Sequence, residues 1–218
     1  MSEDRMMGRV FEQLDDTLIA WIGKQPMFFV ASAPNDPDGH VNLSPKGDMD
    51  TFRILGPTTF AYLDLLGSGA ETIAHLRENG RIVVMFCAFD GAPKVLRLHG
   101  KGRVVQGHDP EFADLVAAFA PSDALRSILR SVILVEIARI ADSCGFVVPK
   151  MALVEEREQL VRWGEHQEAA NGDGWQEKYF YANNRESIDG LTALDFPDGD
   201  PELDERERKA LTSAGKSL

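Results

Sequence analysis

The stretch AYLDLLGSGAETIAHL, residues 61–76, places a strand, a glycine turn and the start of a helix in immediate succession. Residues 58–66 are apolar and rich in β-favouring side chains, which predicts a strand. The sequence GSG at 67–69 interrupts this pattern, and residues 70–79 return to helical spacing. A strand that turns directly into a helix brings glycine backbone next to the unpaired N–H groups of the helix start, and this arrangement binds phosphate. This stretch is therefore the first candidate ligand site.

One hydroxyl side chain lies within that turn and another follows it. Ser68 and Thr72 supply them, and Gly69 lets the backbone approach a ligand closely. Thr72 stands where a dinucleotide-binding fingerprint has its third glycine, so the motif is not that fingerprint. A purely structural alternative stays open, in which Ser68 is a helix N-cap and the glycines only shape the turn.

Further segments predict strands around this one. They are apolar or alternate with period two, and most connections between them are short; they are residues 27–33, 40–45, 81–89, 94–105 and 128–140. Helices are predicted at residues 11–22, 109–120, 151–170 and 175–182. Leu153 and Trp163 are among the side chains expected to be buried in the third of these helices. Because helices do not alternate regularly with strands, the order favours a mostly antiparallel barrel with peripheral helices over a doubly wound parallel sheet.

A second candidate site follows from the alternation in residues 39–47, GHVNLSPKG. Side chains two apart share a strand face, so Asn42, Ser44 and Lys46 lie together. An amide, a hydroxyl and an ammonium group suit a ligand that carries carbonyls, hydroxyls and a phosphate. The alternative is the exposed face of an edge strand, with which Pro45 is compatible.

A basic row occupies one face of the strand predicted at residues 94–105. It consists of Arg97, His99, Lys101 and Arg103, which alternate with apolar residues and glycines. The row fits either a phosphate-binding surface or the solvated outer face of a barrel.

Length and charge limit the classes of protein to which the chain can belong. Its 218 residues are enough for one domain with a sizeable core. There are 23 Lys and Arg against 35 Asp and Glu, a net charge of −12, which argues against binding of nucleic acids or anionic membranes. A small phosphorylated ligand is not excluded, because a local basic pocket can exist in an acidic protein.

The cellular compartment is predicted from cysteines and apolar runs. Cys87 and Cys144 have neither the spacing of a metal site nor the number needed for a disulfide framework. No apolar run reaches the ~18 residues of a membrane span. Residues 1–16 contain acids and no apolar core, so we expect no secretory signal and a cytoplasmic protein.

Motifs for side-chain catalysis are missing from the sequence. There is no G-x-S-x-G, H-E-x-x-H or C-x-x-C, and the five histidines are scattered. His75 follows Thr72 by three residues, so it could face the same ligand or belong to the core edge. The sequence identifies no catalytic residue, so the catalytic residues stay unknown, and we predict no metal site. An enzyme of this kind would leave the chemistry to a cofactor.

Taken in order, these segments resemble the pyridoxamine 5'-phosphate oxidase-related family of FMN-binding split barrels, in a branch other than the oxidase itself. The motifs that carry the resemblance are FFVASA at 28–33, GHVNLSPKG at 39–47, DTFR at 50–53, residues 61–76, NGRIVVMFCAF at 79–89, LRLHGKGRV at 96–104, DSCGF at 142–146 and SIDGL at 187–191. The resemblance implies a mainly β (α+β) domain over residues 1–192, built on a six-stranded antiparallel split barrel. Residues 193–218 are expected to be an acidic, disordered tail.

The same resemblance implies a homodimer with two FMN molecules in clefts between the barrels. It implies cofactor contacts from Asn42, Ser44, Pro45, Lys46, Asp64, Ser68, Gly69, Thr72, Cys144 and Ser187. Lys46, Ser68 and Thr72 would lie at the phosphate and Asp64 at the ribityl chain. The turns containing Cys144 and Ser187 would approach from the second subunit.

Two departures from the oxidase are visible. Gly69 and Ala70 stand near the positions of its Arg-Lys pair, which weakens the electrostatics of the phosphate site and leaves more to backbone N–H groups. The substrate-binding motif at the C-terminus of the oxidase is not recognisable. The sequence therefore predicts an FMN-dependent oxidoreductase that acts on an unspecified small-molecule substrate or electron donor. The alternatives are a split barrel that binds F420 or haem, with His75 or His99 as axial ligand, and a non-catalytic flavin-binding module.

Overall fold

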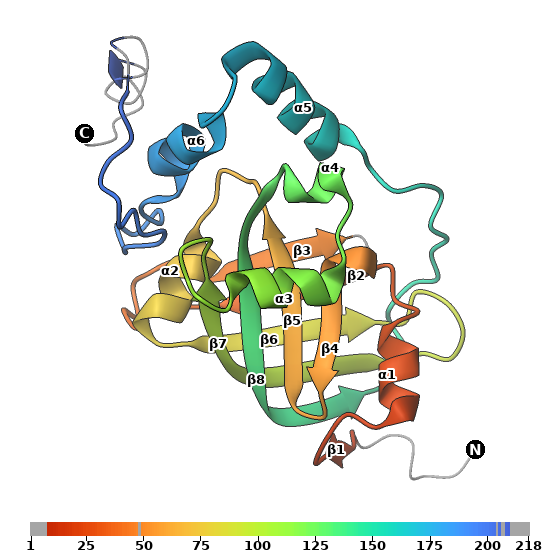
Figure 1. Ribbon diagram of the computed structural model, residues 1–218. Coiled ribbons are helices and arrows are strands. Elements are labelled where there is room, and N and C mark those ends of the chain that lie inside the picture. The colour runs from red at the N-terminus through yellow and green to blue at the C-terminus, as the bar shows by residue number, and fades with distance from the viewer. Residues whose placement is uncertain (1–7, 48, 204, 206–207, 210–218) are drawn as a thin grey trace, which may run out of the picture.

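The computed structural model describes residues 8–47, 49–203, 205, 208 and 209 (Figure 1). Its strands are β1 (Val10–Phe11), β2 (Met27–Ser32), β3 (Asn42–Gly47), β4 (Phe52–Gly56), β5 (Thr59–Leu65), β6 (Arg81–Cys87), β7 (Val95–Val105) and β8 (Leu129–Ser143). All pair antiparallel in one sheet, in the order β3-β2-β6-β7-β8-β5-β4, with β1 beside β8.

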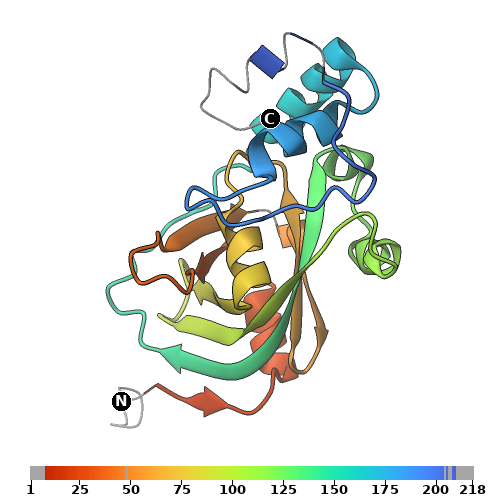
Figure 2. The same cartoon turned by 90° about the vertical axis from the view of Figure 1, so that its left-hand side faces the viewer.

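Helices lie around this sheet rather than between its strands. They are α1 (Asp16–Ile22), α2 (Glu71–Glu78), α3 (Phe112–Phe119), α4 (Asp123–Arg126), α5 (Gln159–Asn171) and α6 (Trp175–Asn184). Helix α3 crosses the outer face of β5 and β8, where it covers Ala61 and Leu63 (Figure 1). Helices α5 and α6 extend beyond one end of the sheet (Figure 2).

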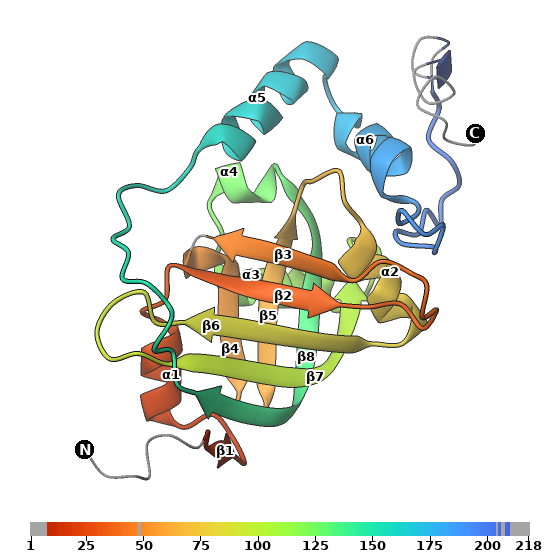
Figure 3. The ribbon, with the colours of Figure 1, turned by 180° about the vertical axis from the view of Figure 1, so that it is seen from behind.

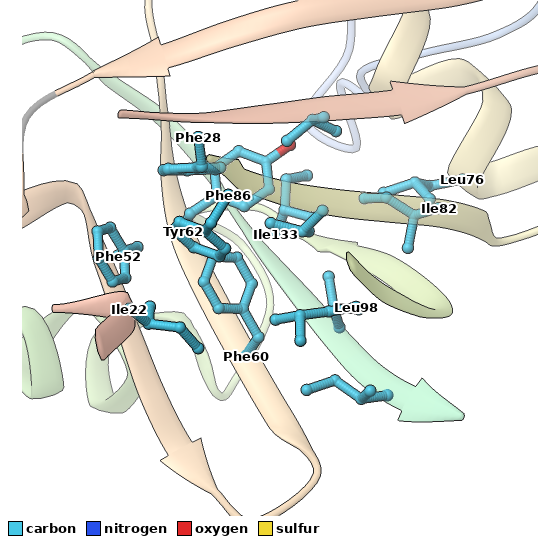
Figure 4. Close-up of a cluster of buried hydrophobic side chains, with 14 of the residues drawn as sticks. Ile22, Phe28, Phe52, Phe60, Tyr62, Leu76, Ile82, Phe86, Leu98 and Ile133 are labelled. Atoms are coloured by element: carbon cyan, nitrogen blue, oxygen red, sulfur yellow. The ribbon is translucent and has the colours of Figure 1, made fainter. Parts of the chain in front are cut away.

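The sheet curls around a single large apolar core. Phe28 of β2 lies in its centre, and four aromatic rings surround it within 5.5–5.6 Å between centroids: Phe52, Phe60, Tyr62 and Phe86 (Figure 4). Buried side chains of α1 and α2 belong to the same core. The burial of aromatic rings from both halves of the sheet holds the curl in place.

The predicted fold class is confirmed: the chain is mainly β, with a curled antiparallel sheet and helices at its periphery. The sequence predicted six strands, and the described sheet contains two more. Strand β1 has only two residues, and the five-residue β4 follows a short helical turn, so neither shows a readable alternation. None of the described helices is long and apolar enough to cross a membrane.

Two helix predictions were wrong at their starts. The helix predicted over residues 11–22 begins only at Asp16, and Phe11 pairs with Ile140 in strand β1 instead. Residues 151–158 have no regular structure, and α5 begins only at Gln159. Leu153 and Trp163, expected to be buried, are 58% and 36% exposed. The apolar spacing of this segment imitates a helical stripe, but its side chains are only partly covered. Trp163 packs against Trp175 and Tyr179 of α6, and the Met151 backbone N–H donates to the Phe89 carbonyl.

Packing continues beyond residue 192, where the tail was predicted to begin. Ala193 and Leu194 are buried in the main core, and their backbone N–H groups donate to carbonyls of Arg185 and Asn184. The segment is therefore anchored through these residues. Residues 204, 206–207 and 210–218 lie outside the description, so the disorder of the tail stays a prediction.

Candidate functional site

The predicted polar row of β3 faces the inside of the barrel. Asn42, Ser44 and Lys46 pair with β2 residues whose side chains are buried, whereas Pro45 lies on the opposite, exposed face. The Asn42 side-chain Nδ2 donates to Thr72 Oγ1 at 2.9 Å, and Ser44 Oγ donates to Asn42 Oδ1 at 3.0 Å. These contacts join the two candidate ligand segments of the sequence, the β3 row and the start of α2, into one site.

Lys46 is tied to a buried carboxylate. Its Nζ donates to Asp64 Oδ1 at 3.3 Å, and Arg130 Nε donates to Asp64 Oδ2 at 2.8 Å. Ser131 Oγ donates to the latter oxygen at 3.1 Å. The side chains of Asp64 and Arg130 are 1% and 5% exposed, against 24% for Lys46. Lys46 is therefore the member of this group that presents charge to solvent.

The charge state of Asp64 results from opposing effects. Burial is the largest and by itself raises the pKa of the carboxyl group. The positive charges of Arg130 and Lys46, together with their hydrogen bonds, outweigh burial and hold the pKa of Asp64 below its ordinary value. The carboxylate thus remains ionised at neutral pH, and the group formed with Arg130 and Lys46 has one net positive charge.

Arg130 also supports the turn that precedes α2. Its Nη1 donates to the carbonyl oxygens of Gly67 at 3.2 Å and Gly69 at 2.8 Å. From the other side, the Asn184 side-chain Nδ2 donates to the Gly67 carbonyl at 2.9 Å. Because both donors bind carbonyls, the turn is fixed without using its own N–H groups.

Helix α2 begins without a side-chain cap. Its N-cap is Ala70, not Ser68, and Ser68 and Gly69 are exposed. The first N–H groups of the helix therefore have no partner within the helix or from a cap side chain. This geometry contradicts the interpretation of Ser68 as N-cap and leaves a backbone site for an anion.

The Glu71 carboxylate reduces the positive charge at the N-terminal end of α2. Glu71 is the first residue of α2, and its Oε1 accepts from the backbone N–H of Ile188 at 3.3 Å. Its charge offsets the net positive charge of the Lys46, Asp64 and Arg130 group. An anion bound here would consequently depend on N–H groups and on the positive end of the helix dipole.

Ser187 and Cys144 lie at different places in the fold. The Ser187 side chain accepts from the backbone N–H groups of Asp189 and Leu191, in a turn that touches the start of α2 within the same chain. Cys144 is exposed and follows the end of β8 opposite to Arg130, so it does not join the site of this chain. Contacts of either residue with a cofactor of a second subunit stay a prediction.

The basic row of β7 also lies apart from the site. Arg97 donates to Ser143, Lys101 to the carbonyl of Asn79, and Arg103 pairs with Glu111. Because each of these side chains has a different partner, the row fits the outer face of a barrel better than a phosphate-binding surface. In the described residues no group of three or more histidine, cysteine, aspartate or glutamate side chains is placed to hold a metal ion.

His75 is a core residue. It is 0% exposed, and its Nδ1 lies 2.9 Å from Ser32 Oγ. Burial is the main cause of a pKa below the ordinary histidine value. The ring belongs to the packing of α2 against β2, where its partner Ser32 lies opposite Asn42 of the β3 row.

Arg130 and Asn184 are functional candidates that sequence reasoning missed. Arg130 is a cation in the largely apolar first half of strand β8, and such a residue signals a buried partner. Asn184 gives no comparable signal, because it lies at the polar end of α6.

Comparison with known proteins agrees with this architecture. The family model for pyridoxamine 5'-phosphate oxidase matches residues 14–144. A pyridoxamine 5'-phosphate oxidase family protein of Aspergillus flavus, ustO, is 40% identical over 194 residues, which cover 84% of this chain and 77% of that protein. The chain belongs to the pyridoxamine 5'-phosphate oxidase family. The resemblance seen in the sequence is thereby confirmed.

Similar solved structures include HupZ of Group A Streptococcus, with 20% identity, 58% of this chain and 91% of that chain covered, and a TM-score of 0.45. An FMN-binding protein of Syntrophomonas wolfei has 14% identity, 63% and 84% coverage, and a TM-score of 0.43. The region matched to the pyridoxamine 5'-phosphate oxidase family contains the β3 row, the 67–69 turn and Arg130, whereas Asn184 and Ser187 lie beyond it.

Proposed function

We propose that the chain binds FMN at the junction of β3 and α2. The observation that carries this proposal is the hydrogen bond from Asn42 to Thr72, because it joins a row of ligand-binding side chains to an uncapped helix start. The phosphate would bind the N–H groups at the start of α2, with Ser68 and Thr72 hydroxyls beside it. Membership of the pyridoxamine 5'-phosphate oxidase family supports the same ligand.

The residues present fit such a ligand in two further respects. Lys46 is partly exposed and has donors beyond the one directed at Asp64, so it can bind an anionic or carbonyl oxygen. The buried Asn184 Oδ1 has no hydrogen-bond partner among the described residues, although its amide lies against the 67–69 turn. An open acceptor at this place suits a hydroxyl donor such as those of a ribityl chain.

The reaction class that we propose is oxidation–reduction of an unspecified small molecule or electron donor. Bound FMN would supply hydride or electron transfer, which side chains alone cannot. The chain would bind and orient the cofactor: Arg130 holds the turn, Asp64 keeps Lys46 in place, and the β3 row offers polar contacts. A cytoplasmic location is part of the proposal and rests on the two cysteines, whose number and spacing do not suggest a disulfide framework.

Purified protein and a flavin titration test the cofactor. We expect a yellow protein with a flavin absorbance spectrum, or a colourless protein that quenches FMN fluorescence and unfolds at a higher temperature in its presence. A colourless protein that does neither would exclude FMN. A Soret band on haem titration, or binding of F420 in preference to FMN, would instead establish one of those cofactors. Reduction by NADH or NADPH with turnover of an acceptor would exclude a non-catalytic flavin-binding module.

The Lys46→Ala substitution is expected to weaken FMN binding by about 1.5–3 kcal/mol, the range for a hydrogen bond to a charged group. Fluorescence titration measures this loss. Lys24→Ala removes an exposed lysine beyond α1 and serves as the matched control, with no expected change. If Lys46→Ala has the same FMN affinity and the same melting temperature as the wild type, Lys46 does not contact FMN and is a surface charge.

We further propose that two copies of the chain associate through the outer face of β3, β2 and β6. None of the helices in the described part of the chain crosses this face (Figure 3). The pairing register places apolar side chains side by side on it, none of them fully buried: Phe29, Ala31, Leu43, Pro45, Val83 and Met85. Leu43 is 65% exposed, and β3 is an edge strand. Covering such a face with a second copy removes apolar area from water.

Phe29→Glu is expected to abolish this dimer, because it places a charge in the centre of the apolar face. Sedimentation equilibrium should give twice the chain mass for the wild type and the mass of one chain for the variant. Leu55→Glu, on β4 at the opposite edge of the sheet order, is the control that should remain dimeric. A wild type that sediments as a single chain would refute the association.

A further inference from the structure

A histidine–aspartate pair lies at the edge of the proposed FMN site. The His40 ring Nδ1 is 2.6 Å from Asp189 Oδ1, and the His40 backbone N–H donates to Asp189 Oδ2 at 2.9 Å. The aspartate therefore fixes both the ring and the backbone of one residue. The His40 side chain is 70% exposed and that of Asp189 16%, so the ring presents its Nε2 side to solvent.

The pair is connected to both elements of the site. His40 precedes Asn42 by two residues, and Asn42 contacts Thr72 in the first turn of α2. On the other side, Ile188, the neighbour of Asp189, donates its backbone N–H to Glu71 of α2. The turn formed by residues 187–190 therefore bridges the start of α2 and the residue that leads into β3.

A cation at this position would add positive charge where the start of α2 has little. Gly69 and Ala70 at the start of α2 carry no charge, and Glu71 offsets the net charge of the Lys46 group. Among these residues, Lys46 is the one cation with donors left for a doubly charged phosphate at the helix start, and its charge is shared with Asp64. A protonated His40, oriented by Asp189, can supply an N–H donor with positive charge.

We propose that His40 binds the phosphate of FMN through Nε2 and that Asp189 is the residue that positions it. The proposal rests on the proposed FMN site. It specifies the ligand end that His40 recognises: the phosphate, and not the flavin ring. Without Asp189 the ring would be free to rotate away, since no other contact of its nitrogens is found in the described residues.

The protonation of His40 links this contact to pH. The hydrogen bond and charge of Asp189 raise the pKa of His40 above its ordinary value, so the charged form persists closer to neutrality. The contact is present below that pKa and is lost as the pH rises through it. The other ionisable groups on neighbouring elements are Asp36 and Asp38 of its own turn and Glu71, His75 and Glu78 of α2.

The test compares FMN with riboflavin, which has the same ring and no phosphate. Affinities are measured by fluorescence quenching between pH 7 and 9, where the phosphate is doubly charged, since its second pKa is about 6. His40→Gln is expected to weaken FMN binding at pH 7 by about three- to fivefold, the range of an exposed ion pair. Riboflavin affinity should not change. The wild-type preference for FMN should fall with rising pH, and that of His40→Gln should be flat.

Two further variants separate recognition from structural support. In Asp189→Asn, the FMN preference is expected to fall at a lower pH than in the wild type. A merely structural role of Asp189 would not produce this shift in pH. His108→Gln removes a histidine outside the site and should behave as wild type. An equal loss for FMN and riboflavin in His40→Gln, or no loss for either, would overturn the role of His40. If neither flavin binds the wild type, the proposed function fails and this role with it.

Discussion

Replacing Arg130 by methionine is expected to lower the free energy of unfolding by about 3–5 kcal/mol, the cost of leaving a buried charge without its partner. Arg130 donates to the Asp64 carboxylate at 2.8 Å, and both side chains are almost completely buried. Methionine has a similar length and no charge. Among the described residues, Lys46 would then be the one cation hydrogen-bonded to Asp64, at 3.3 Å and partly exposed. Urea denaturation at neutral pH measures the loss.

A second effect should accompany this loss in the same variant. The charge of Arg130 is the largest influence that lowers the pKa of Asp64, against the opposing and larger effect of burial. Without Arg130 the pKa of the carboxyl group rises. If the pKa of Asp64 in the folded chain exceeds its value in the unfolded chain, protonation of Asp64 favours the folded chain. The contribution of Asp64 to the free energy of unfolding then increases as the pH falls, which is the reverse of the wild type. The instability of Arg130→Met should therefore diminish on acidification toward the raised pKa.

Matched variants show whether the loss of stability in Arg130→Met comes from the buried ion pair. Arg103→Met removes an arginine of β7 whose pair with Glu111 is half exposed, and it should cost less than about 1 kcal/mol. The double variant Asp64→Leu with Arg130→Met removes both buried charges and should be more stable than Arg130→Met alone. Equal losses for Arg130→Met and Arg103→Met would show that the buried pair contributes no more than a surface pair.

The fold could be predicted where local pattern decides the structure. Alternation and apolar runs gave the six principal strands, and the GSG turn gave the start of α2 to within one residue. The β3 row was likewise readable, because period two alone determines which side chains share a face. The wrong helix start at residues 151–158 has the same origin, since periodicity indicates an apolar stripe but does not say whether anything covers it.

Contacts between distant elements could not be read from the sequence. Asp64 meets Arg130 because β5 pairs with β8 in a register that sets Asp64 opposite Ser131. Asp189 meets His40 only because the 187–190 turn folds back onto α2. Of these four residues, the sequence predicted Asp64 alone as a site residue, and it singled out neither Arg130 nor the His40–Asp189 pair. Charged partners far apart in the chain need tertiary geometry, which no motif records.

Phe28→Ala is expected to destabilise the chain by about 3–5 kcal/mol, the range for removing a buried aromatic ring. The ring is 0% exposed and contacts four other rings from both halves of the curled sheet (Figure 4). The surrounding rings belong to paired strands and cannot close the space without moving the sheet. A cavity therefore remains, and urea denaturation should report its cost.

The matched control is Phe146→Ala, since Phe146 is 61% exposed and should change stability by no more than about 0.5 kcal/mol. Phe28 also lies directly opposite Lys46 in the pairing of β2 with β3. A cavity beneath this pair loosens the strand that carries the polar row, so FMN affinity should fall in Phe28→Ala although the ring does not touch the site. A loss below about 1 kcal/mol would mean that the strands repack around the vacancy, because the cost of such a cavity depends on how far its walls collapse.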